Sequence, residues 1–319
     1  MKRYPLLLSP VTKTALWGGF RLREEYGKES PFEKISEAWE LTVREGDENR
    51  ILNGEASGMT LSAYLASVGF DAVSPSYAGG HFPLLIKLID AADKLSVQVH
   101  PDDAYAHAHG IDSGKTEMWY VAQAAPGATL VSGLREGVSA SDFRDAVARG
   151  ELAAVMREIE VKAGDVFFIP AGLLHAIGAG ILIAEIQQNS DTTYRVWDYD
   201  RRGSDGKLRE LHVKEALEVV RPISDDEIGD ERFSVPPIGI GEPIAACPLF
   251  RVSRLSVRGE DAFTVGRDSF LALTVLSGEG ELSAAGERIS LGKGCTVFLP
   301  AALGEVRLSG DFTALLSAP

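Results

Sequence analysis

The sequence predicts a mainly β fold made of two related jelly-roll modules, with a few short helices. Residues 164–177 read GDVFFIPAGLLHAI and residues 294–307 read GCTVFLPAALGEVR, so a unit of strand, proline-containing turn and strand occurs twice. Short apolar runs punctuated by Gly and Pro dominate the remainder, and helical patterns are few. Many short strands with glycine-rich turns indicate a sandwich or barrel, and the duplication favours two jelly rolls.

The elements follow from the apolar pattern in chain order. Thr60 is a plausible N-cap for a helix over 61–68, Ser139 or Ser141 precedes a helix over 142–149, and a basic loop leads into a third helix over 213–220. Residues 221–243 are acidic and then rich in Pro and Gly, so we interpret them as the connection between an N-terminal module, 1–235, and a C-terminal module, 236–319. Strands are expected over 37–43, 84–89, 95–100, 117–122, 129–132, 165–169, 181–188, 193–199, 271–276, 296–299 and 313–317.

Composition excludes several kinds of partner. The 319 residues carry a formal net charge of −14, which disfavours nucleic acid and anionic membranes but leaves room for a small anion in a local basic pocket. The first apolar run, 6–8, is too short for a signal peptide, and no run is long enough for a membrane span. With two cysteines, Cys247 and Cys295, and no export signal, we expect a reduced, cytoplasmic setting. We further expect a monomer or homodimer.

Two histidines and a carboxylate stand at positions typical of metal ligands. In the strand LSVQV and the following HPDD, Gln98 and His100 share one face while the intervening valines face the core. Glu117 begins the next apolar strand, and His175 follows the Pro-x-Gly turn. Two imidazoles, a carboxylate and a nearby amide suit a divalent ion such as zinc and leave positions for water or substrate.

Only the first copy of the repeat carries the histidine. Glu305 stands in the second copy where His175 stands in the first, and no histidine occurs after His212. We therefore expect one metal ion per chain, held by the N-terminal module. His107 and His109 resemble a ligand pair, but their alanine-rich surroundings favour a helix, on which residues two apart do not face the same way.

Four separated segments resemble the type I mannose-6-phosphate isomerases, and most closely the short bacterial form within the cupin superfamily. They are KLIDAADKLSVQVHPDD, GKTEMWYVA, IPAGLLHAIGAG and IQQNSDTTYRVWDYDR, and they occur in family order. The resemblance runs from about Tyr4 to Val220 and more loosely through the C-terminal module. It implies a pair of cupin-type jelly rolls (a bicupin) and a zinc-dependent enzyme that interconverts mannose 6-phosphate and fructose 6-phosphate.

The resemblance also assigns residues. It implies that Arg195 is the family's catalytic arginine, and that a tryptophan at Trp17 lies near the mouth of the site, although packing would explain an aromatic there equally well. Short forms can hold the ion with the two histidines and the glutamate alone. The implied zinc ligands are Gln98, His100, Glu117 and His175; the implied catalytic residues are Arg195, Lys115, Glu185 and Asp191; the implied substrate contacts are Lys87, Trp17 and Asn189.

The residue types fit enediol chemistry. The isomerisation moves a proton between C2 and C1 without redox change, so it needs a Lewis acid, a base and a cation for the developing charge. Lys115, Glu185 and Asp191 are all open candidates for the base, and Arg195 can stabilise charge or hold the phosphate. If one strand ran through 185–195, its alternate residues would face the site together, although the NSD turn at 189–191 could break it.

Two other functions compete with this one. A two-His-one-carboxylate cupin could instead bind iron and act as an oxygenase. A non-catalytic protein could keep the site in order to sense a sugar phosphate. The lysines and the arginine favour a phosphorylated substrate over the first alternative, and a coupled isomerase assay separates the second.

Overall fold

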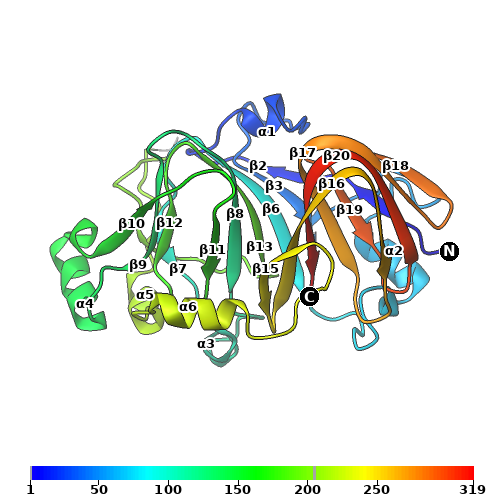
Figure 1. Ribbon diagram of the computed structural model, residues 1–319. Helices are drawn as coiled ribbons and strands as arrows, with labels where there is room; N and C mark the ends of the chain where they lie inside the picture. The colour runs from blue at the N-terminus through cyan, green and yellow to red at the C-terminus, as the bar shows by residue number, and fades with distance from the viewer. Residues whose placement is uncertain (1, 204–205) are drawn as a thin grey trace.

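The computed structural model describes residues 2–203 and 206–319, and these residues form the mainly β fold that the sequence predicts (Figure 1). A five-stranded and a six-stranded antiparallel sheet face each other in the N-terminal part, and a seven-stranded sheet follows. The five-stranded sheet has the order β10 (Met156–Glu160), β9 (Thr129–Leu134), β12 (His175–Ile177), β7 (Val97–Val99), β14 (Tyr194–Trp197). The six-stranded sheet has the order β11 (Val166–Ile169), β8 (Glu117–Ala124), β13 (Ile181–Gln188), β6 (Leu84–Ala91), β3 (Glu37–Leu41), β2 (Val11–Lys13).

The seven-stranded sheet contains strands much longer than the sequence pattern indicates. Strands were expected over 271–276 and 313–317, but β17 and β20 extend well beyond both ranges, and β16 was not expected at all. These strands pair with one another along their length, and their outer ends alternate buried with exposed residues, so the apolar signal there is diluted. The order is β1 (Leu6–Leu8), β19 (Thr296–Leu299), β17 (Leu271–Ala284), β20 (Gly304–Ala318), β16 (Phe250–Val265), β15 (Glu242–Cys247), with β18 (Glu287–Gly292) also on β17.

The three expected helices are present. The Thr60 side chain caps α2 (Leu61–Val68), Ser139 forms a capping box with Asp142 at the start of α4 (Ala140–Arg149), and α5 (Val213–Val219) follows the basic loop. The stretch 221–243, which we interpreted as the connection between modules, has secondary structure that its pattern does not indicate: it contains α6 (Asp225–Arg232) and the start of β15. No residue of α6 is buried, so it shows no apolar period, and a capping box at Ser224 marks its start.

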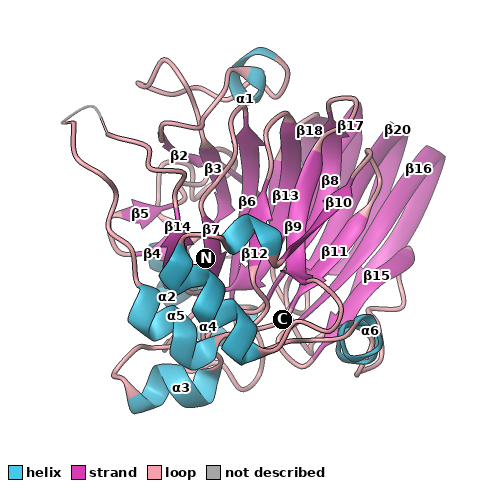
Figure 2. Cartoon of the chain, turned by 90° about the vertical axis from the view of Figure 1, so that its left-hand side faces the viewer, coloured by secondary structure: helices cyan, strands magenta, loops and turns pink. Residues whose placement is uncertain are grey.

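The remaining short elements lie around the edges of the sheets. They are α1 (Arg21–Glu24), α3 (Asp103–Ala108) and the hairpin of β4 (Val43–Arg44) and β5 (Asp47–Glu48). Figure 1 shows α3, α4 and α5 at the end of the molecule that holds the five-stranded sheet, the end that faces the viewer in Figure 2, whereas α2 lies at the opposite end beside the seven-stranded sheet. None of the helices in the described ranges is long and apolar enough to cross a bilayer.

Apolar clusters hold the two facing sheets together. Trp119 of β8 and Ile183 of β13 pack with Leu130 of β9 and Ile177 of β12, so the interior between the sheets is filled from both sides. A second cluster lies on the other face of the five-stranded sheet, where Val97 and Val99 are buried with residues of α4 and α5. The polar residues on the inner face are thereby held on a rigid support.

A buried ion pair and the pairing of an N-terminal strand in the C-terminal sheet join the N-terminal part to the seven-stranded sheet. The Lys28 ammonium lies 2.6 Å from Oε1 of Glu40 on β3, and the Thr296 hydroxyl on β19 donates to Oε2 of Glu40 at 3.0 Å. Burial raises the pKa of Glu40, against the lowering effect of Lys28. In addition, β1 pairs with β19, so the first strand of the chain belongs to the C-terminal sheet. The division at 235/236 stays a prediction.

Candidate metal centre and active site

The repeated turn places His175 in the middle of the five-stranded sheet. After β11 the chain turns at Pro170 and Gly172, and Gly172 has a φ of 90°, which favours glycine. The Gly172 N–H donates to the carbonyl of His100 at 2.9 Å, so the turn is tied to the end of β7. His175 then opens β12, where it pairs with Gln98 on one side and Ser132 on the other.

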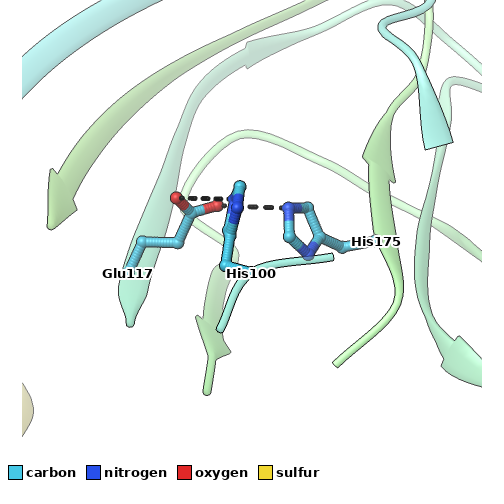
Figure 3. Close-up of side chains that lie close together, drawn as sticks. All are labelled: His100, Glu117 and His175. Carbon is cyan, nitrogen blue, oxygen red and sulfur yellow. Dashed lines mark ion pairs between the residues drawn. The ribbon is translucent and has the colours of Figure 1, made fainter. Parts of the chain in front are cut away.

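His100, Glu117 and His175 form a compact cluster (Figure 3). Their ligand atoms all lie within 4.8 Å of one another, although Glu117 comes from the opposite sheet. Nε2 of His100 is 3.6 Å from Oε2 of Glu117, and Nε2 of His175 is 3.5 Å from Oε1. All three side chains are at most 1% exposed. The structure thus brings together the three residues that the sequence predicted as the core of a metal site.

The cluster fits a metal ion because most of its buried donor atoms lack other partners. Both ring nitrogens of His100 and Oε1 of Glu117 are buried without a hydrogen bond, and Oε2 of Glu117 has only the Lys115 ammonium beside it. Nδ1 of His175 lies 2.9 Å from the Leu173 carbonyl, which leaves Nε2 as the free lone pair of a neutral ring. Burial lowers the pKa of His175 to about 4 and that of His100 well below its usual value. Neutral imidazoles beside a carboxylate form a donor set for a divalent cation.

No second cluster of this kind occurs in the ranges 2–203 and 206–319. The second copy of the turn repeats the backbone, with β19, Ala302 at a φ of 63° and β20. Glu305 is exposed there and pairs with Arg307 at 3.0 Å. His107 and His109 are exposed at the end of α3, away from the cluster, as their helical pattern indicated.

Gln98 and Lys115 both contact the cluster. Nε2 of Gln98 is 3.3 Å from Nε2 of His175, and Oε1 of Gln98 accepts from the Ser96 hydroxyl at 3.4 Å. The Lys115 ammonium is 3.1 Å from Oε2 of Glu117 and is 5% exposed. Burial, together with the charge of Glu185, raises the pKa of Glu117 to about 7, against the lowering effect of Lys115.

Lys87 is held by carboxylates. Its ammonium is 3.0 Å from Oε1 of Glu185, its register partner on β13, and 3.8 Å from Oε2 of Glu37. Burial opposes ionisation of Glu185, but the charges of Lys87 and Lys115 outweigh it and lower the pKa of Glu185 to about 2. Trp119 Nε1 donates to Oε2 of Glu185 at 3.0 Å. A charged side chain in an apolar strand requires a partner of opposite charge. For Lys87 this partner is a carboxylate of the protein itself, that of Glu185.

The stretch from Glu185 to Arg195 is not one continuous strand. β13 ends at Gln188 in one sheet, and β14 begins at Tyr194 in the facing sheet, because the intervening turn crosses between them. Asn189 is buried with Oδ1 unpaired, whereas the Asp191 side chain is 63% exposed and pairs with Arg44 at 2.8 Å. Arg195 pairs in register with Gln98 on β7, so its side chain lies on the same sheet face as that amide.

Trp17 lies in the apolar interior. It is 5% exposed and packs in the cluster that fills the space between the two sheets. Its packing accounts for its position, and a contact with substrate stays a prediction.

Two neighbours of Lys87 escaped the sequence analysis. Glu37 and Trp39 of β3 lie against Lys87: the ammonium is 5.5 Å from the Trp39 ring centroid, and Trp39 Nε1 donates to Oε2 of Glu37 at 2.7 Å. The signal was present in the alternation of EAWEL, which sets Glu37 and Trp39 on one strand face.

The facing sheets with a buried candidate metal site between them define the protein as a cupin with a metal-binding cluster. Comparison with known proteins gives its family. The family model for the phosphomannose isomerase type I catalytic domain matches residues 6–132, and the model for the mannose-6-phosphate isomerase cupin domain matches residues 243–319. The chain is 37% identical to the probable mannose-6-phosphate isomerase GmuF of Bacillus subtilis over 99% of both chains. It is 35% identical to the mannose-6-phosphate isomerase of Streptococcus mutans over 98% of both.

A solved structure agrees with these matches. The crystal structure of the Bacillus subtilis mannose 6-phosphate isomerase superposes with a TM-score of 0.86 at 31% identity, and the match covers 100% of both chains. The chain belongs to the type I mannose-6-phosphate isomerase family.

Proposed function

We propose that this chain is a zinc-dependent aldose–ketose isomerase that interconverts mannose 6-phosphate and fructose 6-phosphate. The observation that carries the proposal is the buried His100, Glu117 and His175 cluster, with unpaired donor atoms, in a chain of this family. Zinc suits this donor set, is inert to redox change, and when bound polarises the substrate oxygens at C1 and C2. We place the enzyme in the cytoplasm, acting on a small sugar phosphate as a monomer or homodimer.

The metal ligands are assigned by contact. His100, Glu117 and His175 would hold the ion, and Gln98, whose amide nitrogen faces His175, would add its amide oxygen once the amide group turns over. The carbonyl of Leu173 fixes the ring orientation of His175, as an outer-shell partner does in metal sites.

Lys115 is our candidate for the group that carries the proton between C2 and C1. Its Nζ contacts Glu117, so it lies beside the place where the reacting carbons would sit. Glu185 is a weaker candidate, because a pKa of about 2 makes a poor base near neutral pH and the carboxylate is committed to Lys87. Asp191 is exposed and paired with Arg44. Arg195, opposite Gln98, would stabilise the negative charge of the enediolate.

The experiment compares Lys115→Met, Glu185→Gln and Asp191→Asn in a coupled isomerase assay, with zinc content measured on each. We expect Lys115→Met to lower kcat by about 100-fold or more and to suppress exchange of the C2 hydrogen with deuterated water, while zinc is retained. The other two variants should keep that exchange. A Lys115→Met enzyme with normal exchange would remove Lys115 from the mechanism, and a wild type without isomerase activity would refute the function.

A further inference from the structure

Residues 209–212, which lead into α5, run beside the edge strand β14. The His212 N–H donates to the carbonyl of Arg195 at 2.7 Å, and Nη1 of Arg195 donates to the carbonyl of Glu210 at 3.0 Å. Arg209, the next residue along, is thereby placed next to Arg195. No role for Arg209 follows from the metal cluster or from the groups around Lys87.

Asp198 is shared by two arginines that differ in how firmly they are held. Nη2 of Arg201 is 2.5 Å from Oδ1 of Asp198, and Nε of Arg201 also donates to the Asp198 carbonyl at 3.2 Å. Nη1 of Arg201 donates to the Lys94 carbonyl, so each nitrogen of this guanidinium is engaged. By contrast, Nη1 of Arg209 is 3.4 Å from the same Oδ1, and its side chain is 34% exposed. Arg209 can therefore turn to a better acceptor at little cost.

Arg195 and Arg209 are neighbouring cations, and one donor of Arg195 has no acceptor. Nε of Arg195 is buried without a hydrogen-bond partner. Burial lowers the pKa of Arg195, and the like charge of Arg209 lowers it further. The charges of Asp198 and Glu210 oppose this effect; Oδ1 of Asp198 is held by Arg201, and its Oδ2 is buried without a hydrogen-bond partner. A dianion placed beside Arg209 would offset the repulsion between the two guanidinium charges.

The position of Arg195 and Arg209 relative to the metal cluster indicates that the dianion is the phosphate of a sugar. Gln98 touches His175, Arg195 is the register partner of Gln98, and Arg209 lies beyond Arg195. The order across the sheet is thus cluster, amide, first guanidinium, second guanidinium. In a hexose 6-phosphate, C6 is four carbon–carbon bonds from C2 and carries the phosphate on its oxygen, so a sugar whose C1 and C2 face the cluster must place its phosphate away from the cluster.

We propose that Arg209 binds the phosphate of the substrate, next to Arg195 and on the side away from the metal cluster. This assignment rests on the proposed function. The planar fork of a guanidinium matches two phosphate oxygens, and Arg209 can leave its long contact with Asp198 to make that pair. Arg201 stays with Asp198 as part of the support.

The test uses full-length wild type, Arg209→Gln and Arg209→Lys, with Arg202→Gln as the matched control. Arg202 lies in the same loop and carries the same charge, but it is exposed and its Nη1 donates to the Gly206 carbonyl. For each protein, kcat and KM for mannose 6-phosphate and the inhibition constant of inorganic phosphate are measured, with a thermal melt as the check on folding.

We expect Arg209→Gln to raise both KM and the phosphate inhibition constant by about 10- to 100-fold while kcat changes little, because the contact is made in ground and transition states alike. Arg209→Lys should show a smaller rise, and Arg202→Gln should match wild type. The assignment is overturned if Arg209→Gln leaves both constants within about twofold, if it lowers kcat alone, or if Arg202→Gln has an equal effect. If Arg209→Gln fails to fold, KM and the phosphate inhibition constant of Arg209→Lys test the assignment in its place. A wild type that does not isomerise would instead refute the proposed function.

Discussion

Replacing Lys28 with methionine should destabilise the chain strongly, because the change leaves a buried charge alone. The Lys28 ammonium is 6% exposed and Glu40 is fully buried, and their contact is 2.6 Å. Removing one partner of such a pair typically costs about 3–5 kcal/mol, since the remaining carboxylate keeps its desolvation penalty without its counter-ion. We expect Lys28→Met to lose about that much free energy of unfolding near neutral pH, measured by urea denaturation.

The matched control is Lys28→Met combined with Glu40→Gln, which removes the charge as well. Neutralising both groups can be nearly neutral for stability, so the double variant should recover most of the loss. The amide oxygen introduced by Glu40→Gln could also still accept from the Thr296 hydroxyl, which donates to the carboxylate in the wild type.

The pH dependence gives the same test a definite sign. Folding raises the pKa of Glu40 above its ordinary value of 4.5, and loss of Lys28 raises it further. A carboxyl whose pKa is higher in the folded state contributes stability at low pH that is lost as the pH rises through the folded pKa. The difference in free energy of unfolding between Lys28→Met and the double variant should therefore decrease as the pH falls. The reasoning would be refuted if Lys28→Met lost less than about 1 kcal/mol of free energy of unfolding, or if the double variant were no more stable than the single one.

Two further predictions concern the site. His100→Ala and His175→Ala should abolish isomerase activity and lower metal content while cooperative unfolding persists, because the sheets are held by their own apolar clusters; loss of cooperative unfolding would mean that the metal is structural. Arg195→Lys should lower kcat by about 100-fold with zinc content unchanged, since lysine keeps the charge but loses the planar fork; a raised KM with normal kcat in steady-state kinetics would assign Arg195 to ground-state phosphate binding instead.

The sequence was informative where chemistry and local pattern coincide. The repeated turn located His175, strand alternation located His100 and Gln98, and the start of an apolar strand located Glu117; the structure brings the two histidines and the glutamate into one cluster. Turn residues and alternation act over a few positions, so a single sequence records them directly.

Features that depend on distant partners were not accessible in the same way. The pairing of Lys28 and Glu40 with Thr296 spans 256 residues from acid to hydroxyl, and no local pattern indicates it. The break between Glu185 and Arg195 arises where a turn takes the chain from one sheet to the facing sheet, in which Tyr194 and Val196 pack on the outer face. The α6 helix was missed because it buries none of its residues.

The central claim is that one metal ion at His100, Glu117 and His175 makes this chain an isomerase. Elemental analysis of the purified wild type and of Glu117→Gln, run in parallel with the coupled mannose 6-phosphate assay, tests it most directly. We expect one zinc ion per chain and isomerase activity in the wild type, and loss of both in the variant. Two metal ions per chain, bound iron with oxygen uptake, or full activity without a divalent ion would contradict the account.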